Sequence, residues 1–183
     1  GLTCIQIDPG TAFGTGAHET TQLCIRALNR YMKLMQAAGV CDIRVLDVGT
    51  GSGILGIAAK KLGAAEIFAT DLDDHALEAV AENLASNDLN PKDFTVVCGN
   101  LIDDPAVQAA AGEACYDIAL ANILAPVILM LEKEVWRHLK IGGIFITSGI
   151  IDDKEEEVRA AIAANPHFEV LEVNRQGEWS SVV

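Results

Sequence analysis

The stretch VLDVGTGSGILGIAA, Val45 to Ala59, decides the fold of this 183-residue chain. A short apolar run leads into Gly49-Thr50-Gly51-Ser52-Gly53, and apolar residues at helical spacing follow it. Glycine allows a sharp turn and a close approach of the backbone to a ligand. The helix N-terminus that follows offers unpaired N–H groups and partial positive charge. The pattern therefore predicts a strand, a cofactor-binding loop and a helix, with the loop at the carboxyl end of the first strand of an α/β sheet.

Strand-like and helical segments alternate outward from this motif. We expect strands at 2–7, 44–48, 66–70, 94–98, 116–121 and 144–148, helices at 23–38, 54–62, 73–86, 126–139 and 152–164, and a turn at 142–143. Strands separated by helices indicate a parallel sheet covered on both faces. Too few residues join segments 168–174 and 179–183 for a crossover helix, so these two must be antiparallel. The expected fold is a doubly wound, Rossmann-like α/β sheet with an antiparallel edge hairpin.

The composition is that of an ordinary soluble domain: 50% of the residues are hydrophobic, 21% are charged, and the net charge is −13. An acidic surface repels phosphate backbones, no apolar run reaches the length of a membrane span, and no signal peptide opens the chain. We therefore expect one cytoplasmic domain that binds neither nucleic acid directly nor a membrane. The five cysteines are expected to be reduced core residues. Neither they nor the four histidines have metal-ligand spacing, so we predict no metal site.

A carboxylate lies at or near the carboxyl end of each of the first two predicted strands. Asp47 lies two residues before Gly49, where it would face a pyrophosphate unfavourably but would suit a cationic ligand. Asp71 can accept hydrogen bonds from both ribose hydroxyls of a nucleoside, each worth about 1.5–3 kcal/mol. Because Gly51 to Gly56 also matches the G-x-G-x-x-G dinucleotide fingerprint, an NAD-dependent oxidoreductase is an alternative. S-adenosylmethionine, which carries an ammonium and a sulfonium but no phosphate, fits the two carboxylates better.

Polar residues also follow the third and fourth strands. Asn100 and the pair Asp103-Asp104 lie where an adenine would be recognised. Asn122 can accept a hydrogen bond from a substrate amine and aim the nitrogen lone pair at a methyl group. Its alternative role is to cap the helix that starts near Pro126. No buried lysine–carboxylate pair or catalytic histidine stands out, so a transfer reaction is expected to rely on positioning and desolvation.

Four stretches resemble the bacterial methyltransferases that modify ribosomal protein L-eleven, the PrmA type. They are DPGTAFGTGAHETT (8–21), DVGTGSGILGIAA (47–59), ATDLD (69–73) and ANILAP (121–126), followed by LKIGGIFITSGI and the closing GEW. The glycine loop marks only the class I methyltransferase superfamily, whereas the opening stretch and ANILA are more specific. The resemblance implies a seven-stranded sheet with the last strand antiparallel. It also implies S-adenosylmethionine as the methyl donor, and lysine side-chain or N-terminal amines of a ribosomal protein as acceptors.

The resemblance also assigns site residues. In the family the segment corresponding to 13–21 folds against the cofactor, so 8–21 is expected to be a lid. Phe13 and His18 are expected on the methionine side of the pocket, with His18 a candidate proton acceptor and Asn122 the residue that positions the amine. The resemblance places cofactor contacts on Thr21, Gly49, Asp71 and Asn122. The full expected cofactor site is Phe13, Thr21, Asp47, Gly49, Gly51, Gly53, Asp71, Leu72, Asn100 and Asn122.

The resemblance has two departures. Family members carry a small N-terminal substrate-recognition domain and a linker, and this chain begins after both, so 1–183 is expected to be the catalytic domain alone. Where the family has a threonine and a proline beside the histidine, this chain has Ala17 and Glu19. Three alternatives remain: a class I methyltransferase that acts on another protein or a small molecule, an NAD-dependent oxidoreductase, and a cofactor-binding scaffold without catalysis. The sequence predicts no oligomeric state.

Overall fold

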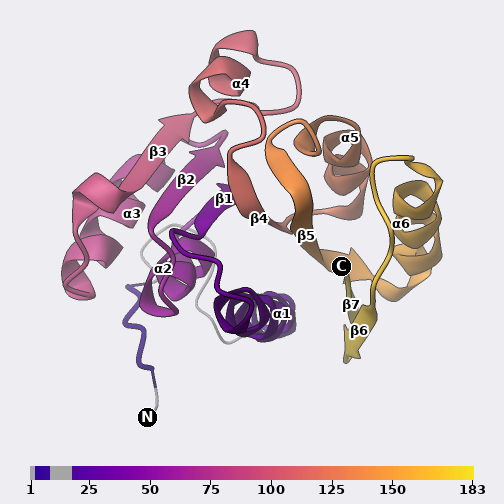
Figure 1. Ribbon diagram of the computed structural model, residues 1–183, viewed down its shortest axis with the longest axis horizontal. Coiled ribbons are helices and arrows are strands. Elements are labelled where there is room, and N and C mark those ends of the chain that lie inside the picture. The colour runs from indigo at the N-terminus through magenta and orange to yellow at the C-terminus, as the bar shows by residue number, and fades with distance from the viewer. Residues whose placement is uncertain (1–2, 9–17) are drawn as a thin grey trace.

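The computed structural model describes residues 3–8 and 18–183 and confirms the doubly wound α/β sheet (Figure 1). The seven strands lie in the order β3-β2-β1-β4-β5-β7-β6. They are β1 Arg44–Val48, β2 Glu66–Asp71, β3 Phe94–Cys98, β4 Tyr116–Asn122, β5 Leu139–Ile151, β6 Val173–Gln176 and β7 Trp179–Val182. Strands β1 to β5 are parallel, and β7 is antiparallel to both β5 and β6. The expected antiparallel edge hairpin is therefore present.

Helices cover both faces of the sheet because successive strand residues point to opposite sides. The helices are α1 Glu19–Ala37, α2 Ile54–Lys61, α3 His75–Ser86, α4 Pro105–Ala111, α5 Ala125–Val135 and α6 Asp152–Ala164, with a short 3-10 helix η1 at Pro91–Asp93. Val45 and Ile118 pack against α1, α2 and α3, whereas Leu46 and Ala119 pack against α4 and α5. Helix α6 packs beside α5 over β5 and β7. None of the helices in the described ranges has the length and apolar character needed to cross a membrane.

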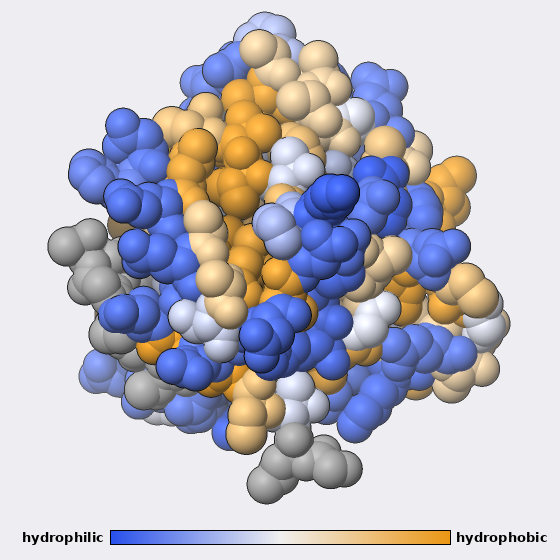
Figure 2. All heavy atoms as spheres, turned by 90° about the vertical axis from the view of Figure 1, so that its left-hand side faces the viewer, coloured by the Kyte–Doolittle hydropathy of each residue, from blue (hydrophilic) through white to orange (hydrophobic). Residues whose placement is uncertain are grey.

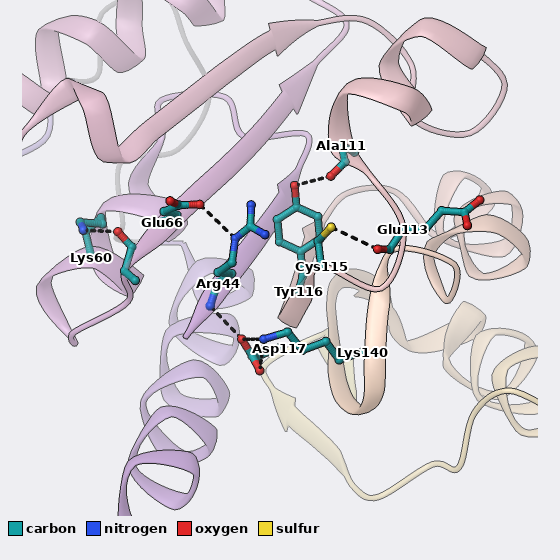
Figure 3. Close-up of polar contacts among 10 residues, drawn as sticks. Arg44, Lys60, Glu66, Ala111, Glu113, Cys115, Tyr116, Asp117 and Lys140 are labelled. Carbon is teal, nitrogen blue, oxygen red and sulfur yellow. Dashed lines mark hydrogen bonds and ion pairs between the residues drawn. The ribbon is translucent and has the colours of Figure 1, made fainter. Parts of the chain in front are cut away.

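Polar contacts join the amino ends of the central strands (Figure 3). The Asp117 carboxylate accepts hydrogen bonds from the Arg44 backbone N–H at 2.9 Å and from Lys140 Nζ at 3.0 Å. The Arg44 side chain lies 3.0 Å from a Glu66 carboxylate oxygen and 5.3 Å from the centre of the Tyr116 ring. These contacts tie β1, β2, β4 and β5 together at one end. The opposite end of such a sheet, at the carboxyl ends of the strands, is where ligands bind.

Strand β3 forms one edge of the sheet and pairs only with β2. From the side that carries β3, an apolar strip runs down the surface below α4 between hydrophilic regions (Figure 2). Val96 and Val97 are half-buried there, while Thr95 and Cys98 are exposed. In the described part of the chain, this edge of the sheet has no further strand beside it.

Helix α1 begins at Glu19 rather than at the predicted Leu23. The His18 side chain accepts a hydrogen bond from the Thr20 backbone N–H and so caps the helix one turn earlier. The first turn of α1 was not predicted because residues 18–22 are polar and lack the apolar spacing that indicates a helix.

Helix α5 ends at Val135 rather than at the predicted Leu139. The apolar pattern continues beyond Val135, but the backbone oxygen of His138 accepts hydrogen bonds from Cys115 N at 2.9 Å and Tyr116 N at 3.1 Å. The chain here therefore pairs with the start of β4 instead of continuing the helix.

Strand β5 is longer than predicted, and β6 is displaced. The glycines at 142–143, predicted as a turn, lie within β5, which begins at Leu139. Strand β6 covers Val173–Gln176 rather than 168–174, and the hairpin turn falls at 177–178.

The sequence analysis did not predict α4, Pro105–Ala111. Asp104 Oδ1 accepts hydrogen bonds from Ala106 N at 2.9 Å and Val107 N at 3.4 Å, and a proline occupies the first turn. An aspartate followed by proline is a recognised helix start, so the Asp104-Pro105 pair was the signal that was overlooked.

Residues 3–8 do not form the predicted strand. Their backbone instead bonds to the side-chain amides of Asn83 on α3 and of Asn87 at the C-cap of this helix. Asn87 accepts from Gln6 N at 2.9 Å and donates to Gln6 O at 2.6 Å, and Asn83 accepts from Asp8 N at 2.9 Å. The two asparagines replace the neighbouring strand that an extended segment would otherwise need.

The prediction of core cysteines holds only for Cys24, which is buried. The other four are exposed or half-buried, and none forms a disulfide: Cys4, Cys41, Cys98 and Cys115.

Candidate functional site

A cavity of about 520 Å³ lies at the carboxyl ends of β1, β2 and β4. Its walls come from the start of α1, the glycine loop after β1, the loops after β2, β3 and β4, and the beginning of β7. Small-molecule sites in proteins have volumes of roughly 300–1,000 Å³. The cavity therefore has the size and the place in the sheet expected of a site for a nucleoside cofactor.

The glycine loop has a backbone that other residues adopt only with strain. Gly49, Gly51 and Gly53 have φ angles of 72°, 54° and 83°, in the left-handed region that favours glycine. The backbone N–H groups of Gly49 and Thr50 donate to Thr70 O at 2.8 and 3.0 Å, which ties the loop to β2. Gly49 and Gly51 line the cavity, whereas Gly53 lies behind the loop as the N-cap of α2.

Asp71 joins the glycine loop to the loop after β2. Its Oδ2 accepts a hydrogen bond from Gly51 N at 2.8 Å, and its Oδ1 accepts one from Asp73 N at 3.0 Å. A carboxylate oxygen can accept more than one hydrogen bond, so both oxygens can still bind ribose hydroxyls. Asp71 and the exposed Leu72 both line the cavity.

Asp47 lies beneath the glycine loop rather than in the cavity wall. Its Oδ2 accepts hydrogen bonds from Thr50 Oγ1 at 2.8 Å and Gly56 N at 3.2 Å, and the residue is only 1% exposed. Its Oδ1 is buried without a hydrogen-bond partner among the described residues. Burial raises the pKa of Asp47 to about 6, and the bonds from Thr50 and Gly56 oppose this rise. Asp47, expected to face a cationic ligand, therefore bonds to the glycine loop and does not line the cavity.

Asn122 and Thr21 bring the fourth strand and the first helix together. Asn122 Nδ2 donates to Thr21 Oγ1 at 3.3 Å, and both residues line the cavity. This bond uses an amide N–H, so the Asn122 carbonyl oxygen can still accept a hydrogen bond. Helix α5 begins at Ala125 without a side-chain cap. Asn122 therefore does not have the capping role considered as its alternative.

His18 lines the cavity and has its Nδ1 engaged. This nitrogen accepts from Thr20 N at 3.3 Å and lies 2.8 Å from Thr20 Oγ1. A ring nitrogen that accepts a hydrogen bond is unprotonated, so in the neutral ring the proton is on Nε2. With Nδ1 engaged and Nε2 protonated, the geometry gives no support to His18 as the proton acceptor.

Trp179, at the start of β7, lines the cavity but is absent from the residues expected there. Its ring meets the His18 ring edge-on, with centroids 5.2 Å apart. The residue lies 161 positions after His18, so no local pattern connects the two. The closing GEW motif was the available signal.

Apolar residues from the segments after β3 and β4 form much of the cavity lining. Asn100 lines the cavity, and its Oδ1 accepts a hydrogen bond from Ile102 N at 3.0 Å. Asp104, which caps α4, is not among the lining residues. The apolar lining residues from the loops after β3 and β4 and from the first turn of α5 are Leu101, Ile102, Ile123, Leu124 and Val127.

The charge of the cavity comes from one carboxylate. Among the described lining residues Asp71 is the only acid, His18 is the only histidine, and neither lysine nor arginine is present. A ligand with net positive charge therefore fits this lining better than a pyrophosphate, which carries two negative charges.

The structure brings most of the expected residues together. The expected residues that line the cavity are His18, Thr21, Gly49, Gly51, Asp71, Leu72, Asn100 and Asn122. Asp47 and Gly53 support the glycine loop from behind, and Phe13 lies outside the described residues.

Known proteins match this chain over nearly its whole length. The family model described as Ribosomal protein L11 methyltransferase (PrmA) matches residues 2–183. The ribosomal protein L11 methyltransferase of Lachnospira eligens is 49% identical over 182 residues, covering 100% of this chain and 55% of its own length. That of Agathobacter rectalis is 51% identical over 178 residues, covering 97% and 54%. The chain thus spans about half the length of the curated relatives it matches.

A solved structure agrees with this assignment. The ribosomal protein L11 methylase from Lactobacillus delbrueckii subsp. bulgaricus superimposes with a TM-score of 0.81 at 37% identity, covering 97% of this chain and 82% of that one. The chain belongs to the ribosomal protein L11 methyltransferase (PrmA) family.

Proposed function

We propose that this chain is the catalytic domain of an S-adenosylmethionine-dependent methyltransferase that methylates amines of a ribosomal protein. Relatives that are 49% and 51% identical are named for methylation of ribosomal protein L11. We infer the same substrate protein here, with lysine side chains or the N-terminal amine as acceptors. The observation that carries the proposal is the cavity beside the glycine loop, with Asp71 as its one carboxylate and no cationic side chain in its described lining.

The residues present fit this cofactor. Asp71 offers carboxylate oxygens to the two ribose hydroxyls, and the apolar residues after β3, Leu101 and Ile102, offer a surface for the adenine. Gly49 and Gly51 allow the methionine part to approach the backbone closely. When bound, S-adenosylmethionine supplies a methyl group on a positively charged sulfur. Its net charge is +1, because the sulfonium and ammonium outnumber the single carboxylate.

Asn122 is proposed to orient the acceptor. The bound cofactor would supply a methyl group to a neutral amine nitrogen, which would give up a proton in exchange. The Asn122 carbonyl oxygen can accept one amine N–H and so direct the lone pair towards the methyl group. When the two reactants are held in this way, their translational and rotational entropy is lost on binding. The uncatalysed reaction must lose the same entropy on reaching the transition state. Thr21, which bonds to the Asn122 amide, keeps that amide in place.

The attacking amine must be neutral. A lysine side chain has a pKa of about 10.4, so deprotonation at pH 7 costs about 4.6 kcal/mol. The apolar wall residues Leu124, Val127 and Trp179 lower the pKa of an amine that enters, because desolvation disfavours its charged form. Since Nδ1 of His18 already serves as a helix cap, we propose that the proton leaves to solvent before the amine is enclosed. The rate should then rise steeply between pH 7 and 9, whereas a flat profile would contradict this step.

The direct test is a methyl-transfer assay with the full-length protein. Ribosomal protein L11 and small primary amines are offered in parallel with labelled S-adenosylmethionine, and mass spectrometry locates the methylated nitrogens. The proposal predicts methylation of L11 amines and little labelling of the small amines. Labelling of small amines alone would indicate a small-molecule methyltransferase, and cofactor binding without any transfer would indicate a scaffold.

A further inference from the structure

Asn83 connects two parts of the chain that lie far apart in sequence. The side chain comes from the inner face of α3 and is only 1% exposed. Its Nδ2 donates to the backbone oxygen of Ser52, inside the glycine loop, at 2.9 Å. Its Oδ1 accepts from the backbone N–H of Asp8 at 2.9 Å. One buried amide therefore holds the glycine loop with one end and the segment 3–8 with the other.

Two neighbours on α3 complete this arrangement. Val80, one turn earlier, packs behind the loop so closely that a Cβ on Gly53 would lie 3.0 Å from it. Asn87, one turn later, bonds to both backbone groups of Gln6 and donates to the Asn83 backbone oxygen at 2.7 Å. Asn87 thus anchors the segment 3–8 without touching the glycine loop. Among these three residues, Asn83 alone bonds to both parts.

We propose that Asn83 is a positioning residue of the cofactor site, which acts by fixing the backbone at Ser52 relative to that at Asp8. The proposal rests on the proposed function, since the loop it positions is the one assigned to the cofactor. Ser52 lies between Gly51 and Gly53, and Gly51 donates to the proposed ribose ligand Asp71. A displacement at Ser52 therefore moves the backbone that lines the cavity and disturbs the carboxylate beside it.

The two bonds of Asn83 can be separated by substitution. Asn83→Asp keeps an acceptor for Asp8 N but cannot donate to Ser52 O when ionised, whereas Asn83→Leu removes both bonds at similar volume. Asn87→Leu is the matched control, because it releases Gln6 and leaves the bond to Ser52 intact. All three variants alter a buried amide on α3 or at its C-cap, so their unfolding temperatures report the structural cost that they share.

The first readout is the affinity for S-adenosylmethionine, measured by calorimetry. Loss of a buried hydrogen bond that orders the loop should weaken binding about tenfold in Asn83→Leu and Asn83→Asp. Asn87→Leu should remain within about twofold of the wild-type affinity despite a similar fall in unfolding temperature. Equal affinities in the Asn83 and Asn87 variants would overturn the positioning role.

The second readout is amide hydrogen exchange without cofactor, at Gly51 N and Gly53 N, which donate to Asp71 and Thr50 respectively. Exchange at these amides should be faster in the Asn83 variants than in wild type and unchanged in Asn87→Leu. Unchanged exchange in Asn83→Leu would refute the link between α3 and the loop. If wild type failed to bind the cofactor, the proposed function would fall, and exchange would still decide whether Asn83 orders the loop.

Discussion

Substitution of Asp47 by asparagine should make the protein more stable at neutral pH. The carboxylate is buried beneath the glycine loop, and burial raises its pKa from 3.8 to about 6. A rise of about two pKa units corresponds to roughly 3 kcal/mol between the two protonation states. Above pH 6 the folded protein must hold this group ionised in a site that disfavours the charge. Asparagine has nearly the same shape and no charge to bury.

The pH dependence fixes the sign of the effect. Between about pH 4 and pH 6 the folded state binds a proton that the unfolded chain has already released. The wild-type stability contributed by this group is therefore fully present below about pH 4 and is lost as the pH rises to about 6. The stability of Asp47→Asn relative to wild type should increase by roughly 3 kcal/mol across that window and then level off.

Urea unfolding curves of the two proteins between pH 4 and pH 7.5 measure this difference, because groups that titrate alike in both proteins cancel. Asp88→Asn is the matched control: Asp88 is exposed and has a φ of 55°, which asparagine also tolerates. The control removes one carboxylate from the surface, so it measures the effect of losing an exposed charge alone. The difference in unfolding free energy between Asp47→Asn and wild type could instead stay constant from pH 4 to pH 7.5, or the variant could become less stable than wild type as the pH rises. Either result would show that burial of the Asp47 charge does not destabilise the folded protein.

Three further predictions concern the cavity. Asp71→Asn should weaken S-adenosylmethionine binding about tenfold or more in calorimetry, since it removes the charge of the proposed ribose acceptor and leaves an NH2 group in place of one of the two oxygens that accept from Gly51 N and Asp73 N; unchanged affinity would remove Asp71 from the site. Asn122→Ala should lower turnover in the methyl-transfer assay more than cofactor affinity; a fall in affinity alone would make Asn122 a cofactor contact only. Gly149→Ala should lower the unfolding temperature by roughly 5 °C or more. At a φ of 87° its new Cβ would collide with the backbone oxygen of Ile123, and an unaltered melting curve would show that the backbone yields without strain.

The sequence predicted best those parts of the site that depend on local backbone geometry. Strand β1 and the start of α2 fall where the glycine loop indicated. Asp71 was found because a polar residue at the end of a parallel strand must lie at the same edge as the loop. Asn100 and Asn122 line the cavity for the same reason, whereas His18 and Thr21, at the start of α1, were expected there from the resemblance.

Side-chain alternation explains why Asp47 does not line the cavity. Asp47 shares its face of β1 with Val45, which packs under α1 and α2. A residue two positions along the same strand points to the same side, so Asp47 points under α2 rather than into the cavity. Period-two alternation could have predicted this, whereas the argument from charge alone could not.

The other omissions depend on contacts between distant parts of the chain. Trp179 enters the cavity because β7 is inserted between β5 and β6, and no local pattern specifies that place. Asn83 looks like an ordinary polar residue of an amphipathic helix until its partners at Asp8 and Ser52 are known. For Trp179 and Asn83 alike, the role of the side chain depends on tertiary packing and could not be predicted from the residue type.

The cavity should accept a positively charged sulfur nucleoside and exclude a dinucleotide. Calorimetric titration of this chain with S-adenosylmethionine and, separately, with NAD measures both properties. We expect saturable one-to-one binding of S-adenosylmethionine and no measurable heat from NAD. Binding of NAD in preference to S-adenosylmethionine, or of neither compound, would contradict it.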